Sequence, residues 1–451
     1  MIHRERLEFS LEKEKSIFIE THKKSQEAYL EKGEVLLYSA PMNWMQMWPG
    51  GFPISIERAK EDTLVDLDGN TYTDFCLGYS AGLTGHGGEE ICKTFYTAMK
   101  DGMVYTLPSK LDAQVGRLLK ERFGQEYWGF ALSATDANRF SIKLARQVTK
   151  RRKILIFNGC YHGTVEETFA YSEEGKTTTR VGQIGIAYEV GKITTAIEFN
   201  DLDALQKELE KEEYACLLLE PVMTNCGIIH PEEGYLTKAK ALCKKHGTIF
   251  IIDEAHTITA GPRGYTGEYN LEPDILVLGK CIGGGFPVGA YGIRKDLKTR
   301  VDEIIKAEFA DTSGIGGTMT GSVMAMHAIK AALEIEITPE NMYRAKTICD
   351  YFSDCMTNII VEYHLPWHMN RLGSRADISF SSIMARNAKE SFAIHDHDLY
   401  EYLFIGAMNR GFVFSPYYNI MATFSYYTRK ETIDDFILSL RELLDGICTK
   451  D

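Results

Sequence analysis

The sequence lacks the features that mark secreted, membrane-spanning or disulfide-rich proteins. Its N-terminus has no apolar core of signal-peptide length, and no stretch approaches the ~18 consecutive apolar residues of a transmembrane helix. The ten cysteines are scattered and form no Cys-x-x-Cys pair, so zinc ribbons and thioredoxin-like motifs lack support. Free thiols are typical of a reducing compartment. We therefore expect a cytoplasmic protein with no membrane partner.

Positive charge is also in short supply. Lysine and arginine number 50 against 63 aspartates and glutamates, which gives a formal net charge of −13. Because nucleic-acid-binding proteins need a basic surface, we expect no nucleic-acid partner. Two histidine pairs, His364/His368 and His395/His397, have no matching ligand cluster in the sequence around them, so no metal site is expected.

The chain has 451 residues, enough for two or three domains. Residues 10–32 are charged and helix-like, and residues 63–75 alternate around an Asp-Gly turn, as in a hairpin. We predict three parts: an N-terminal arm with a hairpin that contributes to the small domain, a large domain and a small C-terminal α+β domain. Their boundaries are residues 1–75, 76–330 and 331–451.

The middle of the chain carries the pattern of an α/β fold. Short continuous apolar runs alternate with amphipathic helical segments; the runs are 154–157, 215–219, 248–252 and 275–278. Such runs are typical of strands buried on both faces of a parallel sheet. We predict a doubly wound, mostly parallel sheet in the large domain.

Polar residues follow three of these runs where a core strand would end. They are Glu220, the pair Asp253-Glu254, and Lys280. In open α/β sheets ligands bind at the carboxyl ends of the strands, so these side chains should converge on one crevice. A partly desolvated lysine can form a Schiff base, and a carboxylate such as Asp253 can keep the pyridine nitrogen of pyridoxal phosphate (PLP) protonated. Taken singly, the acids could instead be helix caps and the lysine a surface residue.

A phosphate site is also available in the sequence. Residues 133–138, Ser-Ala-Thr-Asp-Ala-Asn, directly precede or open a predicted helix that runs to Lys150. A helix N-terminus offers free N–H groups to an anion. The alternative is a plain N-cap, made by Ser133 or Thr135, with no ligand.

With these residues in place, the chain resembles the class III PLP-dependent aminotransferases, which are fold-type-I PLP enzymes. It looks most similar to their glutamate-1-semialdehyde aminomutase-like branch. The motifs that carry the resemblance run in family order: LVDLDGNTYTDF (64–75), Gly85-His86, SATDANRFSIKLAR (133–146), GCYHG (159–163), Glu220-Pro221-Val222, IIDEA (251–255), GKCIGGGFPVG (279–289) and Gly317-Thr318.

The resemblance implies a role for each matching residue. Lys280 would form the internal aldimine, Asp253 would pair with the ring nitrogen, and Tyr161 would stack on the ring. Further cofactor contacts are implied for Ser133, Ala134, Thr135, His162, Glu220, Asn225, Ala255 and Thr318, the last toward the phosphate of the partner subunit. The family pattern also implies a homodimer with shared active sites, to which the N-terminal arm would contribute.

Departures from the family pattern bear on the reaction. No arginine lies between Arg6 and Arg58, where the aminomutase is expected to bind its substrate carboxylate, and Ile420 falls near the position of its gating glutamate. We therefore predict an intermolecular, ping-pong aminotransferase that moves an amino group from a hydrophobic or aromatic amine or amino acid to a keto acid. Trp44, Tyr79 and Tyr417 would line the substrate pocket. The alternatives are a PLP-dependent amino-acid racemase or epimerase, and a glutamate-1-semialdehyde-type aminomutase.

Overall fold

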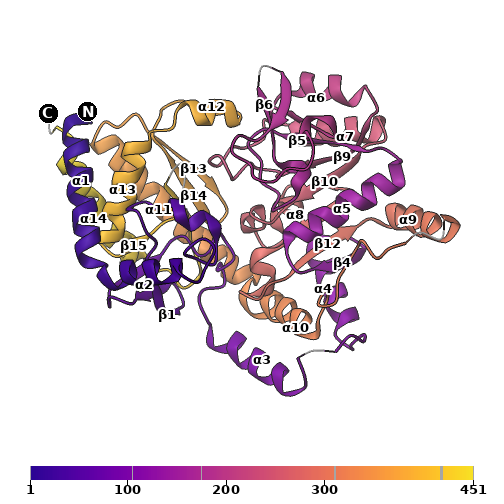
Figure 1. The fold of residues 1–451 in the computed structure, drawn as a ribbon, viewed down its shortest axis with the longest axis horizontal. Coiled ribbons are helices and arrows are strands. Elements are labelled where there is room, and N and C mark those ends of the chain that lie inside the picture. The colour runs from indigo at the N-terminus through magenta and orange to yellow at the C-terminus, as the bar shows by residue number, and fades with distance from the viewer. Residues whose placement is uncertain (1, 104, 174, 309–310, 417–419, 450–451) are drawn as a thin grey trace. The chain divides into compact units, whose positions relative to one another are not determined.

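The computed structural model describes residues 2–103, 105–173, 175–308, 311–416 and 420–449. Two compact units make up the chain (Figure 1). The first unit comprises Met1–Gly88, Glu340–Met384 and Ile394–Asp451, and the second comprises Glu89–Pro339 and Ala385–Ala393. Every helix in the described part of the chain is too short or too polar to cross a bilayer. The three-part domain division and its boundaries stay a prediction.

The second unit is built on a seven-stranded sheet with the order β4-β12-β11-β10-β9-β5-β8. Only β12 runs antiparallel to its neighbours, which agrees with the predicted mostly parallel sheet. Its central strands are buried on both faces, which explains their unbroken apolar runs. The strands are β4 (Tyr127–Ala131), β5 (Lys153–Phe157), β8 (Thr194–Ile197), β9 (Tyr214–Leu219), β10 (Ile249–Asp253), β11 (Ile275–Leu278) and β12 (Gly289–Ile293).

Helices pack around this sheet. The apolar face of α5 lies against it, and the α5 residues Ala137, Ile142 and Ala145 share one core with strand residues. A small hairpin, β6 (Ala170–Glu173) with β7 (Lys176–Thr179), forms a two-stranded sheet of its own beside β8, whose Ala196 amide donates to the Thr177 hydroxyl at 2.9 Å. The helices are α3 (Glu89–Lys100), α4 (Asp112–Phe123), α5 (Ala134–Thr149), α6 (Leu202–Leu209), α7 (Tyr235–Lys245), α8 (Gly264–Glu268), α9 (Lys295–Glu308), α10 (Val323–Ala331), which continues as a π-helix over Ala332–Glu336, and α12 (Ala388–Ala393).

The first unit combines two small sheets with long helices. One sheet has the order β1-β2-β3-β15 and the other the order β13-β14-β16. The strands are β1 (Ile56–Lys60), β2 (Thr63–Asp66), β3 (Thr71–Asp74), β13 (His368–Leu372), β14 (Arg375–Ser379), β15 (Phe412–Val413) and β16 (Ile420–Thr423). The helices are α1 (Arg4–Thr21), α2 (Lys23–Gly33), α11 (Pro339–Glu362), α13 (His397–Asn409) and α14 (Lys430–Ile447). The predicted hairpin is present as β2 and β3.

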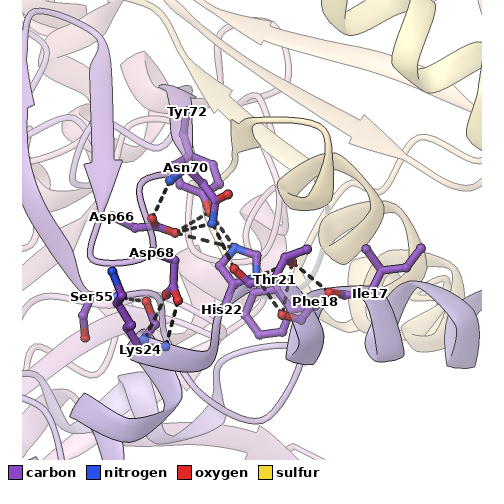
Figure 2. A network of polar contacts seen from close by, with 11 residues as sticks. Ile17, Phe18, Thr21, His22, Lys24, Ser55, Asp66, Asp68, Asn70 and Tyr72 are labelled. Carbon is purple, nitrogen blue, oxygen red and sulfur yellow. Dashed lines mark hydrogen bonds and ion pairs between the residues drawn. The ribbon is translucent and has the colours of Figure 1, made fainter.

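The helix expected over residues 10–32 is two helices, because His22 interrupts it. The imidazole of His22 is buried; its Nδ1 lies 2.7 Å from the Phe18 carbonyl and its Nε2 lies 2.6 Å from the Tyr72 hydroxyl (Figure 2). Tyr72 in turn donates to Asp66 at 2.7 Å. The Asp68 carboxylate accepts from the amides of Lys24 and Ser25 in the first turn of α2. This network fixes the break between α1 and α2 against the β2–β3 hairpin.

Candidate active site

The acid and lysine residues predicted at strand ends lie along one edge of the sheet of the second unit. Glu220 follows β9, Asp253 is the last residue of β10, and Lys280 comes just after β11. These three strands are adjacent and parallel, so their carboxyl ends share that edge. The backbone of Lys280 adopts φ +53°, a left-handed conformation that a non-glycine residue rarely adopts.

The carboxylate of Asp253 is buried and held by three donors. Its Oδ2 accepts from Asn138 Nδ2 at 2.7 Å and lies 2.8 Å from His162 Nδ1, while its Oδ1 accepts from the Ala255 amide at 2.9 Å. Burial favours the neutral acid, but the hydrogen bond and charge of His162 together with the other donors hold the pKa of Asp253 below its ordinary value. The site therefore presents an ionised carboxylate in an interior setting.

The charge state of His162 follows from the same contacts. Burial disfavours the imidazolium, but the neighbouring Cys160 and the hydrogen bond to Asp253 raise the pKa of His162 well above its ordinary value. The imidazole is fully enclosed, so the pair is a buried ion pair in which each partner stabilises the charge of the other.

Glu220 organises the chain on its side of the site. One carboxylate oxygen accepts from the Asn225 side chain at 2.8 Å and from the Tyr161 amide at 3.3 Å, and the other accepts from the Thr224 hydroxyl at 2.7 Å. Glu220 is buried, whereas Tyr161 is 41% exposed. Glu220 thus fixes the main chain that carries Tyr161 and the amide of Asn225.

The N-terminus of α5 lies in a cradle formed by three glycines. Ser133 caps the helix by accepting from the Asp136 amide at 3.3 Å, which leaves the amides of Ala134 and Thr135 at the open end. A Cβ at any of the three glycines would collide with this helix start. It would lie 2.0 Å from Thr135 Oγ1 at Gly163, 2.8 Å from Ala134 Cβ at Gly279 and 2.3 Å from the Ser133 carbonyl at Gly289.

Three further predicted site residues lie in the described parts of the chain. Trp44 and Tyr79, in the first unit, meet edge to face with ring centroids 5.4 Å apart. Thr318 is exposed in the second unit. Tyr417 lies outside the described residues. The assignment of these four residues to substrate or cofactor stays a prediction.

Four arginines elsewhere in the chain are candidates to bind a substrate carboxylate in place of the arginine that residues 43–51 lack. Three of them already have acidic partners. Arg410 pairs with Glu14 at 3.1 Å and Arg371 with Asp350 at 3.3 Å. Arg263 lies 3.6 Å from a glutamate, Glu268. Arg375 is fully buried in β14, where a substrate could not reach it without rearrangement.

Comparison with known proteins decides the family. A sequence model described as aminotransferase class-III matches residues 45–443. The chain belongs to the class III aminotransferase family. Within it, the chain is 35% identical over 339 residues to the glutamate-1-semialdehyde 2,1-aminomutase of Anaeromyxobacter dehalogenans strain 2CP-C, which covers 74% of this chain and 77% of that protein.

Solved structures agree with this assignment. A glutamate-1-semialdehyde aminomutase from Pseudomonas aeruginosa PAO1 superimposes with a TM-score of 0.94 at 33% identity, and covers 99% of each chain. The β-phenylalanine aminotransferase of Variovorax paradoxus gives a TM-score of 0.85 at 25% identity and covers 98% of each chain. These neighbours confirm the fold-type-I architecture of a PLP-dependent enzyme. They support the aminomutase alternative better than the intermolecular transamination that we predicted from the sequence.

Class III aminotransferases use PLP, and the residues present fit this cofactor. The glycine cradle keeps side chains away from the helix start, where free amides suit a phosphate group. The ionised Asp253 suits a protonated ring nitrogen, and Lys280 supplies the amine.

The sequence pattern did not single out Asn138 as a site residue. It lies one turn into α5, on the face that packs against the sheet, and is fully buried. A signal was present, because an asparagine occupies a position where the helical period predicts an apolar residue.

Proposed function

We propose that this chain is a PLP-dependent enzyme that moves an amino group, with Lys280 and Asp253 at the two poles of the cofactor. The observation that carries the proposal is their position at the ends of the neighbouring strands β11 and β10, with Asp253 kept ionised in the interior. When bound, PLP supplies an electron sink that stabilises negative charge at the substrate carbon. Lys280 would hold the cofactor covalently through Nζ and use the same nitrogen to move a proton at that carbon.

The remaining predicted residues would bind and orient the cofactor. The Ala134 and Thr135 amides, with the Ser133 cap, would take the phosphate at the start of α5. Tyr161 would cover one face of the ring. Asn225, fixed by Glu220, would face the ring's oxygen substituent.

For the reaction itself, an intramolecular amino exchange of the glutamate-1-semialdehyde aminomutase type is the first candidate, because the relatives at 33% and 35% identity carry that name. Intermolecular transamination of a hydrophobic or aromatic donor is the second. It is supported by the absence of an arginine from residues 43–51 and by Ile420, whose side chain is apolar and buried in β16. A racemase would use the same lysine and carboxylate.

Substrate tests on the PLP-loaded protein separate these reactions. Glutamate-1-semialdehyde alone should yield the isomer with its amino group moved from C2 to C1. If no isomer forms, and an aromatic amino acid is consumed only when pyruvate or another keto acid is added, the second candidate holds. Loss of optical activity in an amino acid without any acceptor would identify a racemase. A protein that retains no PLP after incubation and desalting would refute the whole proposal.

The active protein would be a homodimer. The second unit exposes a series of large apolar side chains on α3 and the segment after it: Tyr96, Met99, Met103, Tyr105 and Leu107. Such a set on one segment is typical of a surface that a second subunit covers. Sedimentation should give twice the mass of the 50.9 kDa chain, and a monomer at micromolar concentration would contradict this assembly.

A further inference from the structure

Asn138 reaches the carboxylate of Asp253 from helix α5. Its Nδ2 donates to Asp253 Oδ2 at 2.7 Å and also to the His162 carbonyl at 3.2 Å. Both partners are acceptors, so the amide can face them only with its NH2 group, and its orientation is fixed. The side chain is completely buried.

Counting acceptor positions shows what this contact does to Asp253. A carboxylate offers about four lone-pair positions, two on each oxygen. Asn138 and His162 occupy both positions on Oδ2, and the Ala255 amide occupies one on Oδ1. Among the contacts made by the described residues, one position remains open, and it lies on Oδ1. We propose that Asn138 is a positioning residue. It occupies Oδ2 of Asp253 together with His162 and thereby leaves Oδ1 to accept from the ring nitrogen of PLP. This inference rests on the proposed function.

The arrangement is unfavourable for Asn138 itself. Its own Oδ1 is buried and has no hydrogen-bond donor among the residues that the structure describes. A buried acceptor without a donor destabilises the fold, so the asparagine is explained by the two groups to which its NH2 donates, the Asp253 carboxylate and the His162 carbonyl. The contact with the carboxylate matters for the cofactor, because burial alone would favour the neutral form of Asp253. A neutral acid could not balance a protonated ring nitrogen.

The test uses Asn138→Ala in the full-length protein and measures two properties other than turnover. A hydrogen bond to a charged group corresponds to about a 10- to 100-fold change in an equilibrium, so the dissociation constant for PLP should rise by that factor. With PLP labelled with ¹⁵N in its ring, the ring-nitrogen chemical shift should move from the protonated toward the unprotonated range, because Asp253 turns or takes up a proton.

A matched control comes from the same unit. Asn158 is also buried and also donates to a carboxylate, that of Glu198 at 2.6 Å, and this pair includes no residue of the proposed site. Asn158→Ala should leave the ¹⁵N shift unchanged. If Asn138→Ala does not fold, Asn138→Ser, which is shorter but polar, should shift the ¹⁵N signal in the same direction.

The outcomes separate this inference from the proposed function. If the wild-type protein binds PLP and the Asn138 variants bind it with the same affinity and the same ¹⁵N shift, the positioning role is wrong and the proposed function stands. If the wild-type protein binds no PLP, both are wrong.

Discussion

The glycine cradle at the start of α5 gives a prediction whose magnitude follows from the geometry. Gly163 has φ +79°, and a Cβ there would lie 2.0 Å from Thr135 Oγ1 and 2.9 Å from Thr135 Cα. Gly163→Ala therefore combines a strained backbone with a collision against the helix start. The strain corresponds to ~1–2 kcal/mol for an alanine in the left-handed region, and overpacking adds ~1–3 kcal/mol.

A second glycine separates these two effects. Gly182 has nearly the same conformation, φ +75°, but a Cβ there would meet nothing within 4 Å. Gly182→Ala should therefore carry only the backbone strain. The difference between the two variants in their affinity for PLP therefore measures the effect of the collision alone.

The collision should appear in cofactor binding. In Gly163→Ala without cofactor, we expect the loop of Gly163 and the start of α5 to separate and so relieve the contact, whereas a bound phosphate would require both in place. Binding then has to overcome ~1–3 kcal/mol, so the dissociation constant for PLP should rise about 5- to 150-fold in Gly163→Ala. Fluorescence titration of the apoprotein with PLP measures this, with Gly182→Ala expected to bind like the wild type. Equal affinity in both variants would refute a phosphate site at the start of α5.

Three further predictions concern separate residues. Tyr72→Phe leaves buried His22 and Asp66 each without one hydrogen-bond partner, so the free energy of unfolding in urea should fall by about 1–3 kcal/mol; an unchanged midpoint and slope would contradict the network of Figure 2. Borohydride treatment of PLP-loaded protein should add the mass of PLP less one oxygen atom to the wild type and not to Lys280→Ala, because the linkage releases water and the reduction adds two hydrogens. Intact-mass spectrometry measures this, and equal labelling would place the linkage on another lysine. Burial raises the pKa of Glu254 from 4.5 to about 7, so the stability that this acid contributes is complete below pH 4.5 and is lost as the pH rises to 7. The stability advantage of the wild type over Glu254→Gln should accordingly be smaller at pH 8 than at pH 5 in urea unfolding, and a constant difference would show that Glu254 does not titrate in this range.

The sequence is most informative where burial is complete. Strands β5, β9, β10 and β11 are enclosed on both faces, and each appears in the sequence as a continuous apolar run. Strands β4 and β12 were missed, because Tyr127–Ala131 and Gly289–Ile293 contain glycine and bulky aromatic residues with no apolar run. The glycines of β12 have a packing reason that only the fold reveals, since a Cβ at Gly289 would strike the start of α5.

The candidate site also contains residues that the sequence predicts and contacts that only the fold reveals. Asp253 and Lys280 are predictable because strand ends are recognisable in the sequence, and parallel neighbours bring them to one edge. The contact of Asn138 with Asp253 is not predictable from the sequence, because it depends on how α5 is rotated about its own axis against the sheet. The break at His22 is likewise a tertiary effect. Thr21, His22 and Lys23 include no glycine or proline, and the break is fixed by contacts with the hairpin.

The left-handed backbone of Lys280 has an evolutionary consequence. A glycine, or even an asparagine, adopts φ +53° at a lower conformational cost than a lysine, so either substitution would lower the strain in the main chain. In a gene copy that is no longer under selection for catalysis, loss of the amine would carry no penalty. The less strained backbone would stabilise the fold, so substitutions at this position would favour those residues. Loss of this lysine would therefore distinguish a descendant kept as a scaffold from one kept as an enzyme.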